Sequence, residues 1–529
     1  MIRNDLRARF AWRRLALFVL AVAFVTPGWP SATIGGSPSV REAEAQSRAP
    51  TRSRSTRRAR STAAPPAWRA PTGAGALSSD LGSILDGSVR SGRWGVLVVS
   101  LTRGDTLYSV NPDEMLQPAS NMKLFTAAIA LDQFAPSHQF STTVLRTGNL
   151  TADGTVEGDL VLRGDGDPGL SSRFFEGGRS APVDSLAAQV AAMGITRVRG
   201  RLIADATAFD AQRIPDGWQS RYLHASYAAR VSALSMNENL AVIAVTPSSV
   251  GTAPAIAIEP ASPLPIVNKA RTVAGRRSSI VVLPQPNGGV ELRGTIGSRA
   301  GTQRYQVVIE DPAAFTAGAF RRALADRGIT IEGATVEGAS PDDTVRLAEL
   351  PSPPLRDLLA IMNRESINHY AELLFRNAGR AGSDRGVGTV ETANELLQRF
   401  MVQKVGAEPG TVYAADGSGL SVLDKATPRS LVQLLEYAHR APWGETFHAS
   451  LPVAGESELL RNRMQRTPAQ GNLHAKTGTT NAVISLAGYV TAESGELLAF
   501  AFIYNGTDRW NARLTIDAMG PTLASFVRR

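Results

Sequence analysis

The stretch Pro118-Ala-Ser-Asn-Met-Lys-Leu-Phe-Thr126 is where the interpretation of this chain begins. Residues 121–134 carry Leu, Ala and Ile on every side, which predicts a buried helix that starts just after Pro118. Ser120 and Lys123 are three positions apart, so a helix would place both side chains on one face. A serine hydroxyl needs a base to become a good nucleophile, and a buried lysine with a lowered pKa can be that base.

Two further short motifs complete the pattern, and none of the three motifs is specific by itself. Ser366-Ile-Asn368 falls in a predicted helical region, 366–377, and Lys476-Thr-Gly478 falls in a predicted strand, 473–478. We expect Lys476 and Gly478 on one side of that strand, with Gly478 letting a substrate backbone approach closely. The N–H groups of Ser120 and Thr479 would form a two-donor oxyanion hole. The three strings together predict a serine acyl-transfer site that needs no histidine.

Composition excludes several other classes of function. The 529-residue chain is 43% hydrophobic and 19% charged, typical of a soluble protein with roughly two to four domains. Cysteine is absent, and the six histidines show no zinc-binding spacing, so we expect no metal and no cofactor. The net charge of +9 resides entirely in residues 1–60, with twelve arginines and three acidic residues. The remaining chain is balanced, which argues against nucleic-acid binding.

The N-terminal residues predict export. Five arginines precede the apolar run 15–25, which fits a signal peptide, 1–45, and is too short to span a bilayer; an uncleaved anchor is the alternative. Residues 46–76, rich in Arg, Ser and Pro, predict a disordered linker. This linker is either a solvated tether or a contact to an anionic envelope surface. We therefore expect a protein secreted across the cytoplasmic membrane, in the periplasm or cell-wall space.

The rest of the chain predicts an α+β, multi-domain protein. Residues 94–100 and 106–110 indicate a β-hairpin, whereas β-branched runs separated by turns dominate 138–345. Helices are expected at 355–363, 366–377, 390–404 and 430–440, followed by strands at 473–478, 483–491 and 497–504 and a closing helix at 511–527. The segment Asp416-Gly-Ser-Gly-Leu-Ser421 predicts a turn, and Trp218 is expected in the core of an inserted domain.

With these motifs, and with Gly164-Asp-Gly-Asp-Pro168 and His474-Ala-Lys-Thr-Gly-Thr479, the chain resembles the penicillin-recognising serine enzymes. Within them it resembles the D-alanyl-D-alanine carboxypeptidase/endopeptidase family of the penicillin-binding protein 4 type, over about residues 78–527. The 246 residues between Ser120 and Ser366 agree with that family and exceed the gap in β-lactamases. The resemblance implies a transpeptidase-like domain, with helices around an antiparallel sheet, interrupted by two nested β-rich inserted domains.

The resemblance also implies domain boundaries. The transpeptidase-like domain would comprise residues 77–137 and 326–529. Inserted domain II would comprise 138–164 and 242–325, and inserted domain III would comprise 165–241.

Residue roles follow from the same resemblance. Ser120 would be the nucleophile, with Lys123 as its base. Ser366 would relay a proton to the leaving group, and Asn368 would orient substrate and Lys123. A further set would hold the terminal carboxylate of the substrate: Lys476, Thr477, Gly478 and Thr479.

The function implied is hydrolysis of D-alanyl peptide bonds in peptidoglycan stem peptides, with β-lactam antibiotics as covalent inhibitors. A serine β-lactamase and an inactive peptidoglycan-binding scaffold are the alternatives.

Overall fold

The computed structural model describes residues 66–89 and 91–528, which all belong to one compact unit of the chain, 59–529. The predicted signal peptide and most of the predicted linker lie outside the described residues. Helix α2 begins at Ala74, and Thr72 forms a β-bridge with Val527. The ordered body therefore starts before Leu77, because pairing with the far C-terminus fixes residues whose composition predicted a linker. None of the helices within the described residues is long and apolar enough to cross a membrane.

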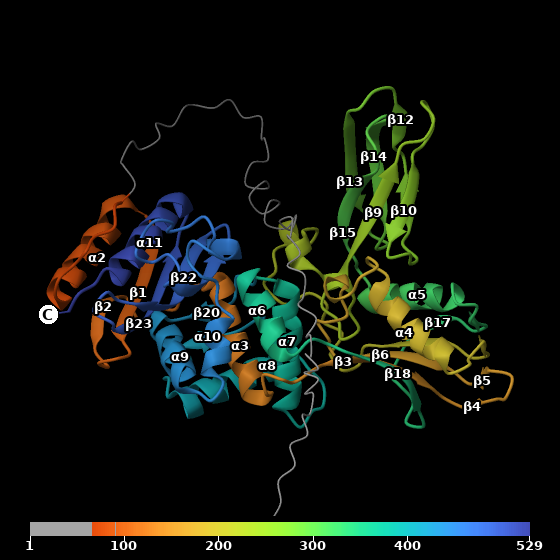
Figure 1. The fold of residues 1–529 in the computed structure, drawn as a ribbon, viewed down its shortest axis with the longest axis horizontal. Coiled ribbons are helices and arrows are strands. Elements are labelled where there is room, and N and C mark those ends of the chain that lie inside the picture. The colour runs from red at the N-terminus through yellow and green to blue at the C-terminus, as the bar shows by residue number, and fades with distance from the viewer. Residues whose placement is uncertain (1–65, 90, 529) are drawn as a thin grey trace, which may run out of the picture. The chain divides into compact units, whose positions relative to one another are not determined.

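A five-stranded antiparallel sheet, in the order β2-β1-β23-β22-β21, forms the centre of the transpeptidase-like part (Figure 1). Its strands are β1 (Arg93–Ser100), β2 (Thr106–Val110), β21 (His474–Thr479), β22 (Val483–Thr491) and β23 (Leu497–Asn505). Strand β1 joins the sheet beside β23, so the first and last strands of the chain are neighbours. The predicted hairpin and the three late strands are confirmed.

Helices cover both faces of this sheet, which explains why its strands are almost continuously apolar. Val96 and Val98 pack with α2 and α11, whereas Leu97 between them packs with α3, α7 and α9 on the opposite face. The helices of this part are α2 (Ala74–Ser88), α3 (Met122–Gln133), α6 (Leu355–Arg364), α7 (Asn368–Ala381), α8 (Val390–Phe400), α9 (Pro428–Arg440), α10 (Gly444–Ala449) and α11 (Arg509–Ala524).

The insertion between the first two motifs contains a mixed sheet in the order β17-β8-β6-β3-β18, beside helices α4 and α5 (Figure 1). Its elements are β3 (Ser141–Arg146), β6 (Leu160–Gly164), α4 (Ala181–Ala192), β8 (Leu202–Asp205), α5 (Pro312–Ala325), β17 (Thr335–Glu337) and β18 (Val345–Pro351). A smaller sheet combines β4 (Asn149–Leu150), β5 (Thr155–Glu157), β7 (Arg197–Val198) and β16 (Thr330–Ile331).

A second β-rich unit lies within the insertion, at residues 240–308. It contains β9 (Leu240–Thr246), β10 (Ala255–Glu259), β11 (Ile266–Asn268), β12 (Arg271–Val273), β13 (Ser278–Pro284), β14 (Val290–Gly297) and β15 (Gln303–Val308). Strands β9, β10 and β15 form one sheet, and β11 to β14 form another. A short two-stranded pair, β19 (Val412–Tyr413) and β20 (Lys425–Ala426), lies outside the insertion.

The sheets divide the insertion differently from the predicted boundaries. Strand β8 lies in the predicted domain III but pairs with β6 of the predicted domain II, and β17 and β18 lie beyond residue 325 yet complete the same sheet. The unit that stands as a separate strand-rich body is 240–308, not 165–241. Sequence patterns did not show this, because strand pairing joins residues that are far apart along the chain, such as Val345 and Arg146.

The second motif also differs from its prediction. Helix α7 starts at Asn368, so Ser366 precedes the helix and adopts a left-handed backbone with φ of 59°. A non-glycine residue rarely adopts this conformation without support from its surroundings. The hydroxyl of Ser366 accepts a hydrogen bond from Lys476, which is one such support.

Candidate active site

Lys123 lies in the first turn of α3 and is completely buried. Its Nζ is 3.2 Å from the hydroxyl oxygen of Ser120, 2.6 Å from the side-chain oxygen of Asn368 and 2.6 Å from the carbonyl oxygen of Ser418. Ser120 belongs to a single 3₁₀ turn, Ala119–Asn121, that leads directly into the helix. The predicted nucleophile and base are therefore in contact, and Asn368 joins them from a second helix.

Three acceptors around one amine suit both protonation states of a lysine. An ammonium group donates three hydrogen bonds, one to each acceptor. A neutral amine donates two, to Asn368 and Ser418, and its lone pair is then free to accept the proton of Ser120. The same geometry thus serves before and after proton transfer, which is a requirement for a positioned general base.

Burial lowers the pKa of Lys123 to about 8, while the carboxylates of Asp416, Glu372 and Asp424 act in the opposite direction. Desolvation disfavours the charged amine, and nearby negative charge favours it. A lysine with this pKa is neutral in a substantial fraction of molecules at neutral to mildly alkaline pH. The site therefore supplies a usable base without a histidine.

Ser366 and Lys476 form a second contact pair. The Nζ of Lys476 donates to the hydroxyl of Ser366 at 2.9 Å and to the carbonyl oxygen of Thr477 at 3.0 Å. Burial first, and the positive charge of Lys123 second, lower the pKa of Lys476 well below its usual value. The charge of Lys123 acts on Lys476, so the pair of Ser366 and Lys476 lies within electrostatic reach of the group formed by Ser120, Lys123 and Asn368.

The strand of the third motif pairs regularly, with Lys476 opposite Ala487 and Gly478 opposite Ser485. Thr477 is buried and Thr479 is exposed. The packing of the protein itself gives a reason for glycine at 478. A Cβ at this position would lie 2.1 Å from the Ser485 hydroxyl and 2.7 Å from the carbonyl oxygen of Pro118. Gly478 therefore allows the strand to pack against the segment that carries Ser120, and its predicted role in substrate approach stays a prediction.

The segment 416–421 forms the predicted turn, but its importance for the site was missed. Asp416 is buried and accepts hydrogen bonds from the N–H groups of Ser418, Gly419 and Ser421 at 2.6–2.9 Å. It also accepts from the Ser418 hydroxyl at 3.2 Å. Gly419, with φ of 85°, has no room for a Cβ because the Ala119 carbonyl oxygen would be 1.9 Å away. This turn therefore presents the Ser418 carbonyl to Lys123.

Trp218 contributes to the same turn from the insertion. Its indole N–H donates to Asp416 at 2.7 Å, so Trp218 lies against the turn behind the site and not only in an inserted-domain core. The carbonyl of Tyr227, also in the insertion, accepts from the amide nitrogen of Asn368 at 2.8 Å. The role of the turn 416–421 has one signal in the sequence, the Asp-Gly-Ser-Gly motif. In this motif an aspartate precedes backbone N–H donors two and three residues later.

Replacing Asp416 with alanine is expected to destabilise the protein by roughly 3 to 5 kcal/mol, because several buried N–H groups lose their acceptor at once. Chemical unfolding of the purified variant, followed by tryptophan fluorescence, would measure this change. Asp343→Ala provides a matched control on an exposed loop position. A loss below about 1 kcal/mol would show that the turn holds its shape without this carboxylate.

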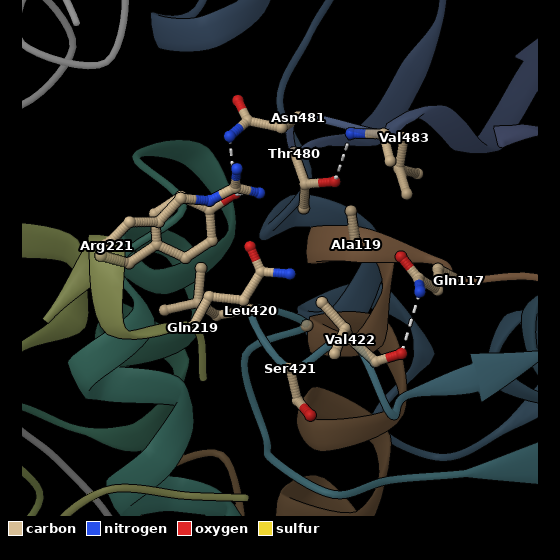
Figure 2. Close-up of a pocket in the computed structure, with 13 residues that line it drawn as sticks. Gln117, Ala119, Gln219, Arg221, Leu420, Ser421, Val422, Thr480, Asn481 and Val483 are labelled. Atoms are coloured by element: carbon tan, nitrogen blue, oxygen red, sulfur yellow. Dashed lines mark hydrogen bonds between the residues drawn. The ribbon is translucent and has the colours of Figure 1, made fainter. Parts of the chain in front are cut away.

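A narrow pocket opens beside the nucleophile (Figure 2). One wall continues from the third motif through Thr480 to Val483, and a second consists of Gly419 to Val422. The third comes from the insertion, where Tyr222 accepts a hydrogen bond from the Asn481 side chain at 2.8 Å. Arg221 is the charged residue of this lining. Among residues 66–89 and 91–528, no three His, Cys, Asp or Glu side chains are placed to hold a metal ion.

A helix-flanked antiparallel sheet with this contact set defines the class of penicillin-recognising serine enzymes. Residues 77–525 match the D-Ala-D-Ala carboxypeptidase 3 (S13) family, and the chain belongs to that family. It is 35% identical over 468 residues to the D-alanyl-D-alanine carboxypeptidase of Actinomadura sp., covering 85% of each chain. It is 26% identical to D-alanyl-D-alanine carboxypeptidase DacB of Haemophilus influenzae, covering 78% of this chain and 85% of that one.

The fold agrees with this assignment. The crystal structure of penicillin binding protein 4 from Haemophilus influenzae superposes with a TM-score of 0.72 at 23% identity, covering 84% of this chain and 99% of that chain. A second structure of the same protein, complexed with a β-lactam, gives a TM-score of 0.67. The predicted fold class, α+β with a transpeptidase-like domain and an insertion, is confirmed.

Proposed function

We propose that this protein is a serine D-Ala-D-Ala carboxypeptidase, with DD-endopeptidase activity, that acts on peptidoglycan stem peptides and is acylated by β-lactams. The observation that carries the proposal is the position of the Lys123 amine between Ser120, Asn368 and Ser418. Family membership supports it, as does the carboxypeptidase activity named for the Actinomadura and Haemophilus relatives.

Acylation would begin with neutral Lys123 taking the proton of Ser120. The serine oxygen attacks the carbonyl carbon of the D-alanyl peptide bond, and the N–H groups of Ser120 and Thr479 stabilise the oxyanion. When the intermediate collapses, the C–N bond breaks and the leaving amine takes a proton relayed through Ser366. Lys476, with Thr477 and Thr479, holds the terminal carboxylate of the leaving D-alanine. Asn368 orients both the substrate and Lys123.

In deacylation, the nucleophile would be a water molecule that attacks the acyl-enzyme. A water molecule loses a proton to the Lys123 amine and attacks the ester carbonyl, which releases the shortened peptide and restores the Ser120 hydroxyl. The pocket between Arg221 and Thr480 adjoins Ala119 and marks the side of the site on which we place the part of the peptide that remains attached to Ser120. A β-lactam would acylate the same serine through its strained amide.

The test is incubation of the exported part of the chain with defined monomeric and cross-linked muropeptides, with products identified by mass. We expect loss of the terminal D-alanine from pentapeptide monomers, and a slower cleavage of cross-linked dimers. Hydrolysis of β-lactams with no change in muropeptides would instead indicate a β-lactamase. Unchanged muropeptides and unchanged β-lactam would indicate a scaffold. Heat-denatured protein is the control for spontaneous hydrolysis.

We also propose that the protein acts outside the cytoplasmic membrane, tethered or attracted to an anionic envelope surface by its arginine-rich residues 46–76. Support comes from the charge distribution alone, because all of the net charge of +9 lies in residues 1–60. Fractionation of cells that express the tagged chain tests the location. Substituting Arg52, Arg54, Arg57, Arg58 and Arg60 with glutamine should release more protein from isolated envelopes. Equal retention of the two forms would contradict the electrostatic contact.

A further inference from the structure

Three buried carboxyl groups lie behind Lys123: Glu372, Asp416 and Asp424, called here the carboxyl cluster. All three residues are completely buried. The mechanism above uses none of them. Acidic groups are rarely buried unless they are paired with cations or stay protonated. The cluster therefore needs a physical explanation of its own.

The contacts of Glu372 connect it to Lys123 through one short peptide segment. Glu372 is one helical turn after Asn368 on α7, and one of its oxygens accepts from the N–H of Gly417 at 3.1 Å. The carbonyl of Gly417 accepts from the Thr126 hydroxyl at 2.6 Å. The next carbonyl, that of Ser418, accepts from Lys123. Glu372 and Lys123 therefore fix two peptide groups of the same turn, and the single peptide group between them is held by Thr126.

The three carboxyl groups differ in how their oxygens are satisfied. Both oxygens of Asp416 accept hydrogen bonds, including one from the Trp218 indole, an arrangement suited to an anion. One oxygen of Glu372 and one of Asp424 have no well-formed hydrogen bond among the described residues, although the Ser418 side chain lies near Glu372 and the Asp416 side chain lies near Asp424. A buried oxygen without a donor favours the protonated carboxylic acid over the carboxylate.

Charges around the cluster are insufficient for three carboxylates. Arg376, on the turn of α7 after Glu372, forms an ion pair with Asp210. Lys123 is the other cation that interacts with the cluster, and Lys476 lies beyond it on the sheet side. Since nearby charges alter one another's ionisation, the protonation of Glu372, Asp424 and Lys123 is coupled.

We propose that Glu372 is a positioning residue that shares one titratable proton with Lys123, so that the base becomes neutral without a change in the net charge of the buried site. In one form Lys123 is an ammonium and Glu372 a carboxylate. In the other, one proton has moved, and the neutral amine faces Ser120 while Glu372 is a carboxylic acid. The inference rests on the proposed function, because it concerns the base that activates Ser120.

The electrostatics of both groups agree with this geometry. Burial raises the pKa of Glu372 to about 8, assisted by Asp416 and opposed by Arg376. The pKa of Lys123 is lowered to about 8. The two groups therefore titrate in the same pH range. Burial and Asp416 likewise raise the pKa of Asp424 well above its usual value.

The test is the pH dependence of Ser120 acylation by a β-lactam, measured as a second-order rate constant for the wild type, Glu372→Gln and Glu496→Gln. Glutamine keeps the oxygen that accepts from Gly417 but cannot titrate. Glu496 is also a buried glutamate, with its partners Ser100 and Arg528 outside the site, and serves as the matched control.

We expect the acid limb of the wild-type profile to spread over more than one titration step. In Glu372→Gln it should become a single step and move to lower pH by roughly half to one unit, because the negative charge that raises the pKa of Lys123 is gone. Glu496→Gln should keep the wild-type profile, and Glu372→Asp should restore a broad acid limb.

A single-step wild-type limb, or a Glu372→Gln profile that coincides with the wild type, would overturn the inference and leave Glu372 a packing role only. The acid limb of the wild-type pH profile tests the inference even if Glu372→Gln does not fold. Failure of the proposed function gives a different result, because the wild-type protein itself would then show no acylation at any pH.

Discussion

Replacing Ser120 with alanine is expected to abolish covalent labelling by penicillin and to lower the rate of D-alanine release by roughly 10⁵-fold or more. The variant has no oxygen to form an acyl-enzyme, and Lys123 has no proton to accept. Intact-mass measurement after incubation with penicillin tests the first effect, and the muropeptide assay tests the second.

The fold should survive this change, because the Ser120 hydroxyl makes one long contact, at 3.2 Å, with Lys123. Ser83→Ala, on the exposed part of α2, is the control and should label like the wild type. A Ser120→Ala protein that still acquires a stoichiometric penicillin adduct would place the nucleophile elsewhere and contradict the proposed mechanism.

Replacing Lys123 with methionine is expected to slow acylation by roughly 10²- to 10⁴-fold, the contribution typical of a positioned general base. Methionine fills a similar volume but takes no proton from Ser120. Stopped-flow or quenched measurement of β-lactam acylation, across the pH range used for the wild type, tests this expectation. The pH dependence that comes from Lys123 should also disappear.

Stability separates this effect from misfolding. The methionine leaves the oxygens of Asn368 and Ser418 without a donor, but it also removes the cost of burying an amine. We therefore expect the free energy of unfolding to change by less than about 3 kcal/mol. Lys404→Met, at a half-exposed lysine paired with Asp132, is the control. Acylation within tenfold of the wild type in Lys123→Met would show that another group is the base.

Local patterns predicted the elements that carry the site. The buried helix after Pro118 was evident because apolar residues surround it on all sides, and the last three strands because their apolar runs end at turn residues. In these segments, propensity and burial agree with the final structure. The start of α7 was misjudged, since Ser366 adopts a left-handed conformation, and one of its supports is a long-range contact with Lys476.

The local sequence patterns did not predict contacts between segments that are far apart in the sequence. Two residues with ordinary surroundings in the sequence, Glu372 and Trp218, meet the same turn from a helix and from the insertion. Likewise no sign in the sequence indicated that the lack of a Cβ at Gly478 admits the backbone of Pro118. Contacts of this kind are fixed only when segments separated by hundreds of residues pack together.

The sequence by itself determined the family and the candidate nucleophile and base, because three short motifs in a fixed order already specify chemistry. Tertiary structure decided how that chemistry is controlled. It buried Lys123 among three acceptors and set Glu372, Asp416 and Asp424 behind it. Burial and charge at a distance of a few side chains set a pKa, and neither is a property of a local stretch of sequence.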